Sequence, residues 1–130
     1  MPEANPRKGL LREFIEFALD RDVTREVEQQ ESVLRIEPGS AKAHFDLGVL
    51  HYSQRRVTQA IAEYEAAIQC DPTFACAYRK LGEIYVSLDE YARAGQYALQ
   101  AAELGDRGLL EMFKRYPAFK KYIERRESEA

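Results

Sequence analysis

Apolar and small residues recur through the middle of this chain at spacings of three and four, which is the period of one face of an α-helix. The pattern predicts four helices, near residues 41–54, 58–70, 74–87 and 90–104. Two more are expected upstream, over about 7–19 and 23–36, because Pro38 prevents the second from continuing. After Gly108 a last helical segment carries an apolar stripe that Pro117 divides or kinks. An all-α fold follows.

Two segments of the chain carry the same pattern of residues, 34 positions apart. Ala-x-Ala-His-x-x-Leu-Gly-x-x-His begins at Ala41, and Ala-x-Ala-Tyr-x-x-Leu-Gly-x-x-Tyr begins at Ala75. Further small residues follow in register: Ala60, Ala67, Ala94 and Ala101. A fixed period of this length is typical of an array of helical hairpins, each of which packs on its neighbours. Glycine and alanine at matching positions allow adjacent helices to approach closely.

The repeated unit resembles the tetratricopeptide repeat, a helix–turn–helix whose pattern is W-x2-L-G-x2-Y, then A-x3-F, then P. The first copy supplies His44, Leu47, Gly48, His51, Ala60, Tyr64 and Pro72 at these positions. The second copy supplies Tyr78, Leu81, Gly82, Tyr85 and Ala94. It departs from the pattern at two places, where Ala98 replaces the aromatic residue and Asp106 replaces the closing proline.

A degenerate copy is expected before these two, because Pro38 precedes Pro72 by 34 residues. It has Phe14 at the glycine position and Glu26 at the alanine position. The resemblance implies a single domain, a right-handed α-solenoid of antiparallel helix pairs. Its expected units are a degenerate repeat at 7–40, repeats at 41–74 and 75–108, and a capping helix region at 109–126.

The residues between the helices predict where two of them begin. Ser40 and Thr73 each stand just ahead of a predicted helix, and their hydroxyl groups can accept a bond from an otherwise unpaired amide of the first turn. Both are therefore candidate N-caps.

The composition places the chain among ordinary globular proteins, with 45% hydrophobic and 32% charged residues. No stretch reaches the roughly 20 apolar residues that span a bilayer, and the first residues lack the apolar core of a signal peptide. A cytoplasmic location is the expectation.

A run of basic and aromatic residues between Arg107 and Arg126 could track phosphates and stack on bases. The net charge of −3 argues against nucleic acid as the partner. The aromatic residues of this run are expected to pack on the last repeat.

The sequence contains no pattern typical of an enzyme. It has no glycine-rich phosphate loop, no His-Glu-x-x-His and no nucleophile elbow. His44 and His51, with Asp46 nearby, could be imagined around a metal, but both occupy positions of packing aromatic residues in the repeat. Cys70 and Cys76 are interpreted as free, partly buried thiols. We expect no catalytic activity, cofactor or metal.

What remains is a surface for a partner. The resemblance implies that the first helix of each pair lines a concave groove. Helical spacing assigns these residues to the face: Leu11, Ile15, Lys42, Phe45, Val49, Tyr52, Arg79, Glu83 and Val86, together with Ser53, Cys76 and Ser87. An apolar patch of this kind on a protein surface marks a binding site, unless a neighbouring helix of the same chain covers it.

Chaperone-binding members of the family hold a carboxylate in a clamp of Lys, Asn and Arg. The matching positions here contain a single cation: Leu11, Ile15, Asp46, Cys76 and Lys80. The sequence therefore favours a non-enzymatic adaptor or co-chaperone-like protein that binds an apolar-anchored peptide or helix. The alternative is a homodimer formed through the same face or through the C-terminal helix.

Overall fold

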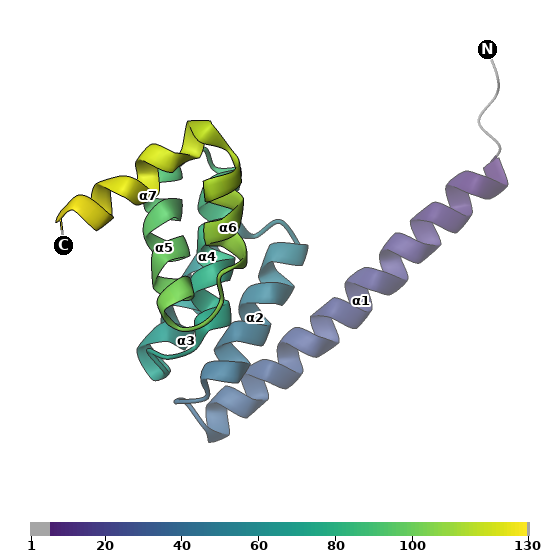
Figure 1. Cartoon of the computed structure of the whole chain (residues 1–130). Coiled ribbons are helices and arrows are strands. Elements are labelled where there is room, and N and C mark those ends of the chain that lie inside the picture. Colours follow the sequence, from purple (N-terminus) through teal and green to yellow (C-terminus); the bar gives the residue numbers. More distant parts are fainter. Residues whose placement is uncertain (1–5, 130) are drawn as a thin grey trace, which may run out of the picture.

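The structure is a computed structural model that describes the backbone of residues 6–129 and the side chains of residue 12 and of residues 22–124. The described residues form seven helices and no strand (Figure 1). Their bounds are α1 Pro6–Ile36, α2 Ala41–Ser53, α3 Val57–Cys70, α4 Ala75–Ser87, α5 Tyr91–Glu103, α6 Gly108–Arg115 and α7 Pro117–Glu129. No helix in this part of the chain is both long and apolar enough to cross a bilayer.

Helices α2 to α5 form two helical hairpins, and all four begin and end within one residue of the predicted positions. The two hairpin turns have the same geometry. Arg55 and Asp89, 34 residues apart, both adopt a φ of 60°. In each turn the next amide bonds back to the preceding helix, from Arg56 N–H to His51 O and from Glu90 N–H to Tyr85 O, both at 2.9 Å. The repeat in the sequence is thus a repeat in backbone conformation.

A glycine lets the two helices of the first hairpin cross closely. The ring of Tyr64 on α3 lies against Gly48 on α2, where a β-carbon would come within 2.7 to 2.9 Å of three ring atoms. Ala60 and Ala67 on the same face of α3 are fully buried. Residues this small leave room for backbone approach, and the Tyr64 ring fills the space that remains.

In the second hairpin, the side chain that packs over the glycine comes from outside the hairpin. Ala98 on α5, the counterpart of Tyr64, is fully buried but cannot reach Gly82 on α4 as a ring would. Leu109 of α6 lies over Gly82 instead, so close that a β-carbon on residue 82 would overlap its methyl group. Helix α6 therefore completes the second hairpin.

The C-terminal segment covers the end of the stack with two helices, because Pro117 divides it as the sequence predicts. Leu110, Phe113 and Ile123 are buried in the core that runs from α3 to α7. Helix α7 crosses α5 at Gly95, where a β-carbon would lie 2.9 Å from the carbonyl oxygen of Tyr122. The basic residues of this segment whose side chains are described, from Arg107 to Lys121, are exposed, whereas most of its aromatic residues pack inward.

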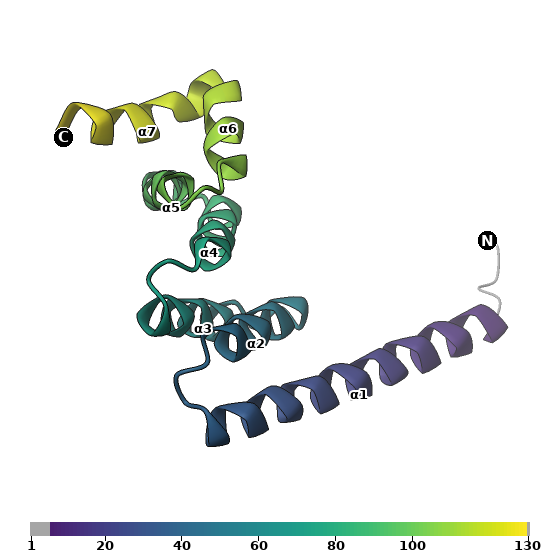
Figure 2. The same cartoon turned by 60° about the horizontal axis from the view of Figure 1, so that its bottom comes forward.

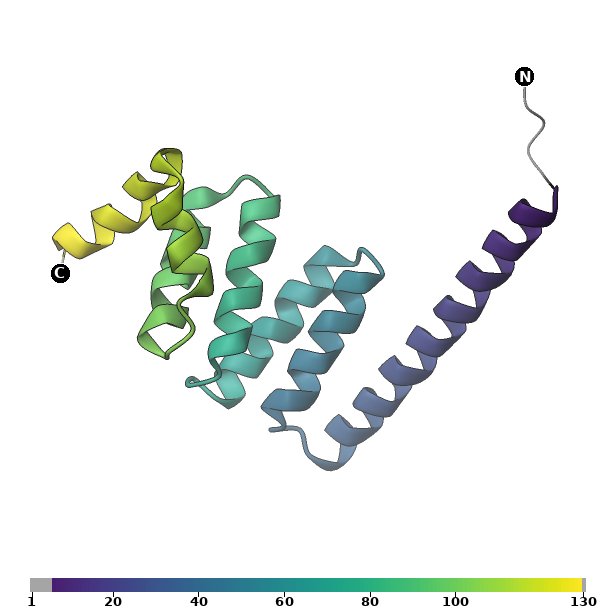
Figure 3. The same ribbon diagram turned by 45° about the vertical axis from the view of Figure 1, so that its right-hand side comes forward.

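The prediction of two helices over 7–19 and 23–36 is wrong, because this stretch is one continuous helix, α1. Its C-terminal part packs on α2 as α3 packs on α4, and its N-terminal part projects away from the other helices (Figures 1 and 3). The residue types explain why no hairpin closes here. Phe14 and Glu26 stand where the first repeat has Gly48 and Ala60, so a bulky and a charged residue occupy the positions of close helix contact.

The two predicted caps differ in outcome. Ser40 is the N-cap of α2, and its hydroxyl accepts a bond from the amide of Ala43 at 3.2 Å. Thr73 is not a cap, because α4 begins after Phe74 without a side-chain cap. Thr73 instead donates from its amide and its hydroxyl to Asp71, at 3.0 and 2.7 Å. These bonds stabilise the turn around Pro72 and lower the pKa of the Asp71 carboxyl.

Candidate functional site

The helices of the stack lie in two rows. Figure 2 shows α2, α4 and α6 on one side and α3 and α5 on the other, with α1 projecting on the side of α2. The side chains predicted for a binding groove belong to α2, α4 and α1. Leu11 and Ile15 lie outside the described side chains, so their placement stays a prediction.

The predicted residues of α2 differ in how accessible they are. Val49 and Tyr52 are 41% and 42% exposed, which is high for large apolar side chains, and Lys42 is exposed. Phe45 is half-buried. Its ring centroid lies 5.5 Å from that of Tyr64 and 5.2 Å from that of Phe74. Phe45 therefore joins two hairpins as a packing residue, while Val49 and Tyr52 remain available for a partner.

Two of the predicted residues of α4, Arg79 and Glu83, belong to a network of charged side chains. Arg79 donates from Nε to Glu83 at 3.0 Å and lies 3.6 Å from the carboxylate of Asp106. Lys80 Nζ lies 3.6 Å from the other oxygen of Glu83. Val86 is partly buried against the core. This helix thus contributes paired charges to the surface rather than apolar contacts.

Tyr64 of α3 lies against Gly48 of α2 and belongs to the buried core that includes Leu81 of α4. Burial raises the pKa of Tyr64 to about 12, and the proximity of Glu83 and Tyr52 adds to that shift. We call the surface formed by Lys42, Asp46, Val49, Tyr52, Arg79 and Glu83 the α2–α4 surface.

A hollow between α1 and α2 adjoins this surface. It is lined by Glu26, Gln29 and Gln30 of α1 and by Asp46, Val49 and Leu50 of α2. Sequence reasoning predicted Val49 and missed the α1 residues, since it assigned them to the outer helix of a hairpin. The charged residue at 26, in place of a buried alanine, was the available signal that α1 presents this face to solvent. We call this site the α1–α2 hollow.

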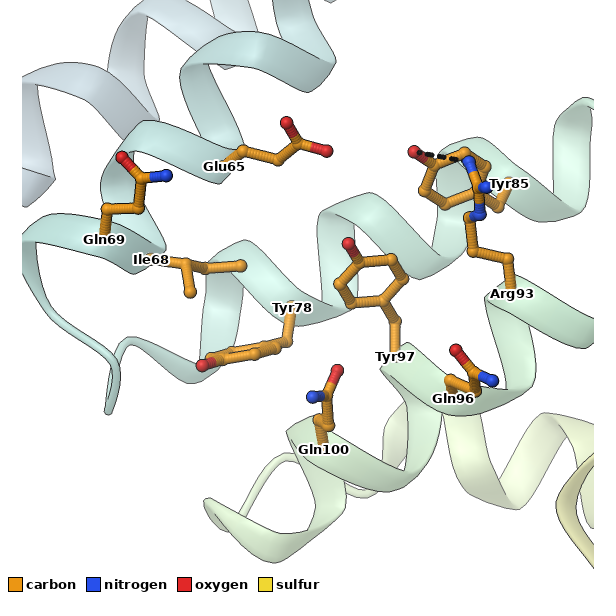
Figure 4. A pocket seen from close by; sticks show the side chains of 9 residues that line it. All are labelled: Glu65, Ile68, Gln69, Tyr78, Tyr85, Arg93, Gln96, Tyr97 and Gln100. Atoms are coloured by element: carbon orange, nitrogen blue, oxygen red, sulfur yellow. Dashed lines mark hydrogen bonds between the residues drawn. The ribbon is translucent and has the colours of Figure 1, made fainter. Parts of the chain in front are cut away.

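A second hollow of about 580 Å³ lies between α3 and α5, with α4 as its floor (Figure 4). Its lining is rich in tyrosine and glutamine: Glu65, Ile68, Gln69, Tyr78, Tyr85, Arg93, Gln96, Tyr97 and Gln100. The rings of Tyr85 and Tyr97 stack with centroids 5.6 Å apart and planes within 6°. Burial and the proximity of Tyr85 and Glu65 raise the pKa of Tyr97. We call this site the tyrosine hollow. The sequence marked Tyr78 and Tyr85 only as packing residues.

His44 makes local polar contacts, and the two cysteines are exposed. The ring of His44 contacts two groups, with Nδ1 2.7 Å from Glu63 and Nε2 3.2 Å from the carbonyl oxygen of Pro38. Within the described part of the chain no three His, Cys, Asp or Glu residues are placed to hold a metal ion. Cys70 and Cys76 are free thiols, and both are exposed rather than partly buried as predicted.

Comparisons with known proteins identify the fold. Residues 50–89 match the family model described as TPR repeat, the tetratricopeptide repeat. A crystal structure of MamA superposes with a TM-score of 0.59 at 24% identity, covering 79% of this chain and 68% of that one. The TPR2B domain of yeast Sti1, from a complex with pHsp70, gives 0.62 at 18% identity, covering 88% and 90%.

A comparison with curated protein sequences found no match. The tetratricopeptide resemblance is confirmed by these findings, and so is the all-α helical-repeat fold that it implies.

Proposed function

We propose that this chain is a non-enzymatic protein-interaction module that binds a segment of a partner protein on the α2–α4 surface, with its apolar anchor in the α1–α2 hollow. The observation that carries the proposal is the position of Val49. This exposed apolar side chain lines the α1–α2 hollow, and Tyr52 lies one helical turn further along the same face of α2. Exposed apolar residues beside a hollow are the usual anchors of protein interfaces.

The residues around this anchor define the chemistry of the partner. Glu26 and Asp46 place two carboxylates in the lining of the hollow, and the amides of Gln29 and Gln30 can donate or accept hydrogen bonds. An amphipathic helix or extended peptide with one apolar residue and a flanking basic residue is complementary to this set. The paired charges of α4 then form a polar rim.

A carboxylate clamp of the chaperone-binding kind does not fit these residues. Lys80, the single cation at the clamp positions, already lies 3.6 Å from Glu83. Arg79, a second cation on the same helix, contacts both Glu83 and Asp106. The partner is therefore proposed to be held by an apolar anchor rather than by its terminal carboxylate.

Substitution of Val49 tests the proposal. Val49→Glu places a charge on the exposed anchor, and circular dichroism establishes that the helices remain intact. Thr58→Glu, on the exposed face of α3, is the matched control. Tagged baits of both variants and of the wild type are compared by quantitative mass spectrometry of captured proteins. Captured proteins are then purified and their affinities for the three baits are measured.

We expect an interface partner to bind Thr58→Glu like the wild type and to bind Val49→Glu at least about tenfold more weakly. If the partner binds both Val49→Glu and Tyr52→Glu as tightly as it binds the wild type, another surface is used. Phe45→Glu is a poor choice for this test, because Phe45 packs between Tyr64 and Phe74.

Self-association through the same face is the alternative function. Sedimentation equilibrium over a range of concentrations distinguishes the two, because a surface reserved for a different partner leaves the chain monomeric. A dimer that dissociates on Val49→Glu would instead assign this face to a second copy of the chain.

A further inference from the structure

One end of the tyrosine hollow contains an arginine bound to an aromatic ring and a carboxylate. The guanidinium carbon of Arg93 lies 5.0 Å from the centroid of the Tyr85 ring, and its Nη1 is 3.5 Å from the hydroxyl of that tyrosine. The same nitrogen lies 3.7 Å from the carboxylate of Glu90. Figure 4 shows Arg93 beside Tyr85 at this end of the hollow. The three groups form an arginine–tyrosine–glutamate cluster.

The other end of the hollow also has tyrosine rings and a carboxylate, the kinds of group that contact Arg93 at the first end. The rings of Tyr78 and Tyr97 lie 6.4 Å apart with planes tilted by 48°. Ile68 faces them from α3, and Glu65 stands on the same helix above them (Figure 4). Glu65 is exposed, and in the described part of the chain no lysine or arginine forms an ion pair with it. Two aromatic rings and a carboxylate therefore line this part of the hollow, and no described lysine or arginine forms an ion pair with the carboxylate.

We propose that this end of the tyrosine hollow binds an arginine side chain of a partner protein. A planar guanidinium can stack on a tyrosine ring and donate two parallel hydrogen bonds to a carboxylate. Its three methylene groups fit against Ile68 and the tyrosine rings. A lysine has neither the flat face nor the forked donors, so arginine is the better complement to the Tyr78, Tyr97 and Glu65 set.

The remaining lining residues extend the site to the backbone of the ligand. Tyr78 and Tyr85 are seven residues apart on α4, which corresponds to about 10 Å along the helix axis. About three residues of extended chain cover that distance. Gln69 on α3 and Gln100 on α5 line the hollow from either side, and their amides can donate to and accept from a peptide backbone. The proposed ligand is therefore a short extended segment with a central arginine.

This site is separate from the α2–α4 surface. It lies between the helices of the second row, α3 and α5, and none of its lining residues lines the α1–α2 hollow. It can exist whether or not Val49 anchors a partner, because the two hollows use different helix faces.

The test uses the full chain and three capped pentapeptides, Gly-Ser-X-Ser-Gly, in which X is arginine, citrulline or lysine. Citrulline has the shape of arginine without its charge. Binding is followed by amide chemical-shift changes in two-dimensional NMR. Glu65→Gln removes the proposed carboxylate at an exposed position, and Glu31→Gln on α1 makes the same charge change elsewhere.

We expect the arginine peptide to shift amides around Glu65, Tyr78 and Tyr97 with a dissociation constant in the millimolar range. Binding should weaken about tenfold in Glu65→Gln, as for the loss of a charge-assisted hydrogen bond, and should not change in Glu31→Gln. Equal shifts from the citrulline peptide, or none from the arginine peptide at tens of millimolar, would overturn the proposal. Equal affinity for the lysine peptide would overturn the assignment to arginine.

Discussion

The side chain of Leu109, from outside the second hairpin, lies directly over Gly82. In the first hairpin the ring of Tyr64 lies in the same way over Gly48. The second repeat loses the aromatic residue at Ala98, and α6 supplies the replacement. The departure from the repeat pattern at Ala98 is therefore coupled to the presence of the C-terminal segment.

Leu109→Ala is expected to destabilise the fold by about 2 to 4 kcal/mol. The leucine is 4% exposed, and its loss opens a cavity over Gly82 and Ala98 that small residues cannot refill. Thermal unfolding monitored by circular dichroism measures the change. Leu104→Ala, which removes the same atoms from a side chain that is 38% exposed, should cost only about 0.5 kcal/mol.

A double-mutant cycle tests whether Leu109 acts through Gly82. Gly82→Ala alone should destabilise by about 1 to 2 kcal/mol, because the added methyl group meets Leu109. In the Leu109→Ala background the same change fills part of the cavity and is expected to stabilise. The two substitutions should therefore be coupled by at least about 1 kcal/mol. Additive effects would show that Leu109 stabilises the fold through other contacts.

Gly95→Ala is expected to detach α7 from α5. The new β-carbon would lie 2.9 Å from the carbonyl oxygen of Tyr122 and 3.1 Å from its β-carbon, so the backbone of α7 must move. We expect a net loss of about 1 to 3 kcal/mol, although alanine favours the helix by about 1 kcal/mol.

Amide hydrogen exchange should increase in α7 and not in α2 or α3. Gly39→Ala, at a glycine with no atom within 4 Å of an added β-carbon, is the control. Unchanged exchange in α7 would contradict the close crossing.

At alkaline pH, Tyr64→Phe is expected to lose less stability than the wild type. The pKa of Tyr64 is raised from 10.0 to about 12 in the folded chain, mainly by burial. The unfolded chain thus releases this proton first, so the contribution is complete below pH 10 and is lost as the pH rises to about 12. The loss is on the order of 2 kcal/mol.

Denaturant unfolding of the wild type and of Tyr64→Phe between pH 8 and pH 12 measures this difference. The two proteins should have similar stabilities at pH 8, because the phenylalanine ring still packs on Gly48 and Phe45. The phenylalanine variant should then become relatively more stable as the pH rises. Parallel curves would show that Tyr64 ionises at its ordinary pKa.

Arg55→Gly is expected to stabilise the first hairpin by about 0.5 to 1 kcal/mol. Arg55 adopts a φ of 60° and is exposed, so glycine relieves the strain of a left-handed residue without removing a buried contact. Arg55→Ala keeps the β-carbon and should give no gain. Chemical denaturation of the three proteins provides the comparison. Equal stability of the glycine and alanine variants would argue against strain at this turn.

The four central helices were predictable from the sequence because their signals are local and repeated. Glycine or alanine at 48, 60, 82 and 94 permits close helix contact, and the interval between the two copies fixes both hairpins at once. A proline such as Pro117 likewise kinks or breaks a helix wherever it falls inside one. Such features depend on few other residues, so the pattern along the chain is enough to interpret them.

Helix α1 was mispredicted because spacing alone does not show that a hairpin can close. The turns at Arg55 and Asp89 contain neither glycine nor proline, so their absence near residue 21 carried no information. The decisive facts are the side chains at Phe14 and Glu26, which are unsuited to a close helix crossing. For the proposed binding surface, too, spacing along the chain does not show which side chains are packed and which are exposed. Phe45 and Val49 share a face of α2, yet only the three-dimensional packing of Phe74 against Phe45 separates them.

The length of α1 affects how the mass of this protein can be measured. Its 31 residues correspond to about 46 Å, whereas a compact chain of 130 residues has a radius of gyration of about 14 Å. A molecule with such a projecting rod diffuses more slowly than a sphere of equal mass. A monomer will therefore elute early from a sizing column and resemble a dimer. Sedimentation equilibrium or light scattering, which report mass without a shape factor, will give its true assembly state.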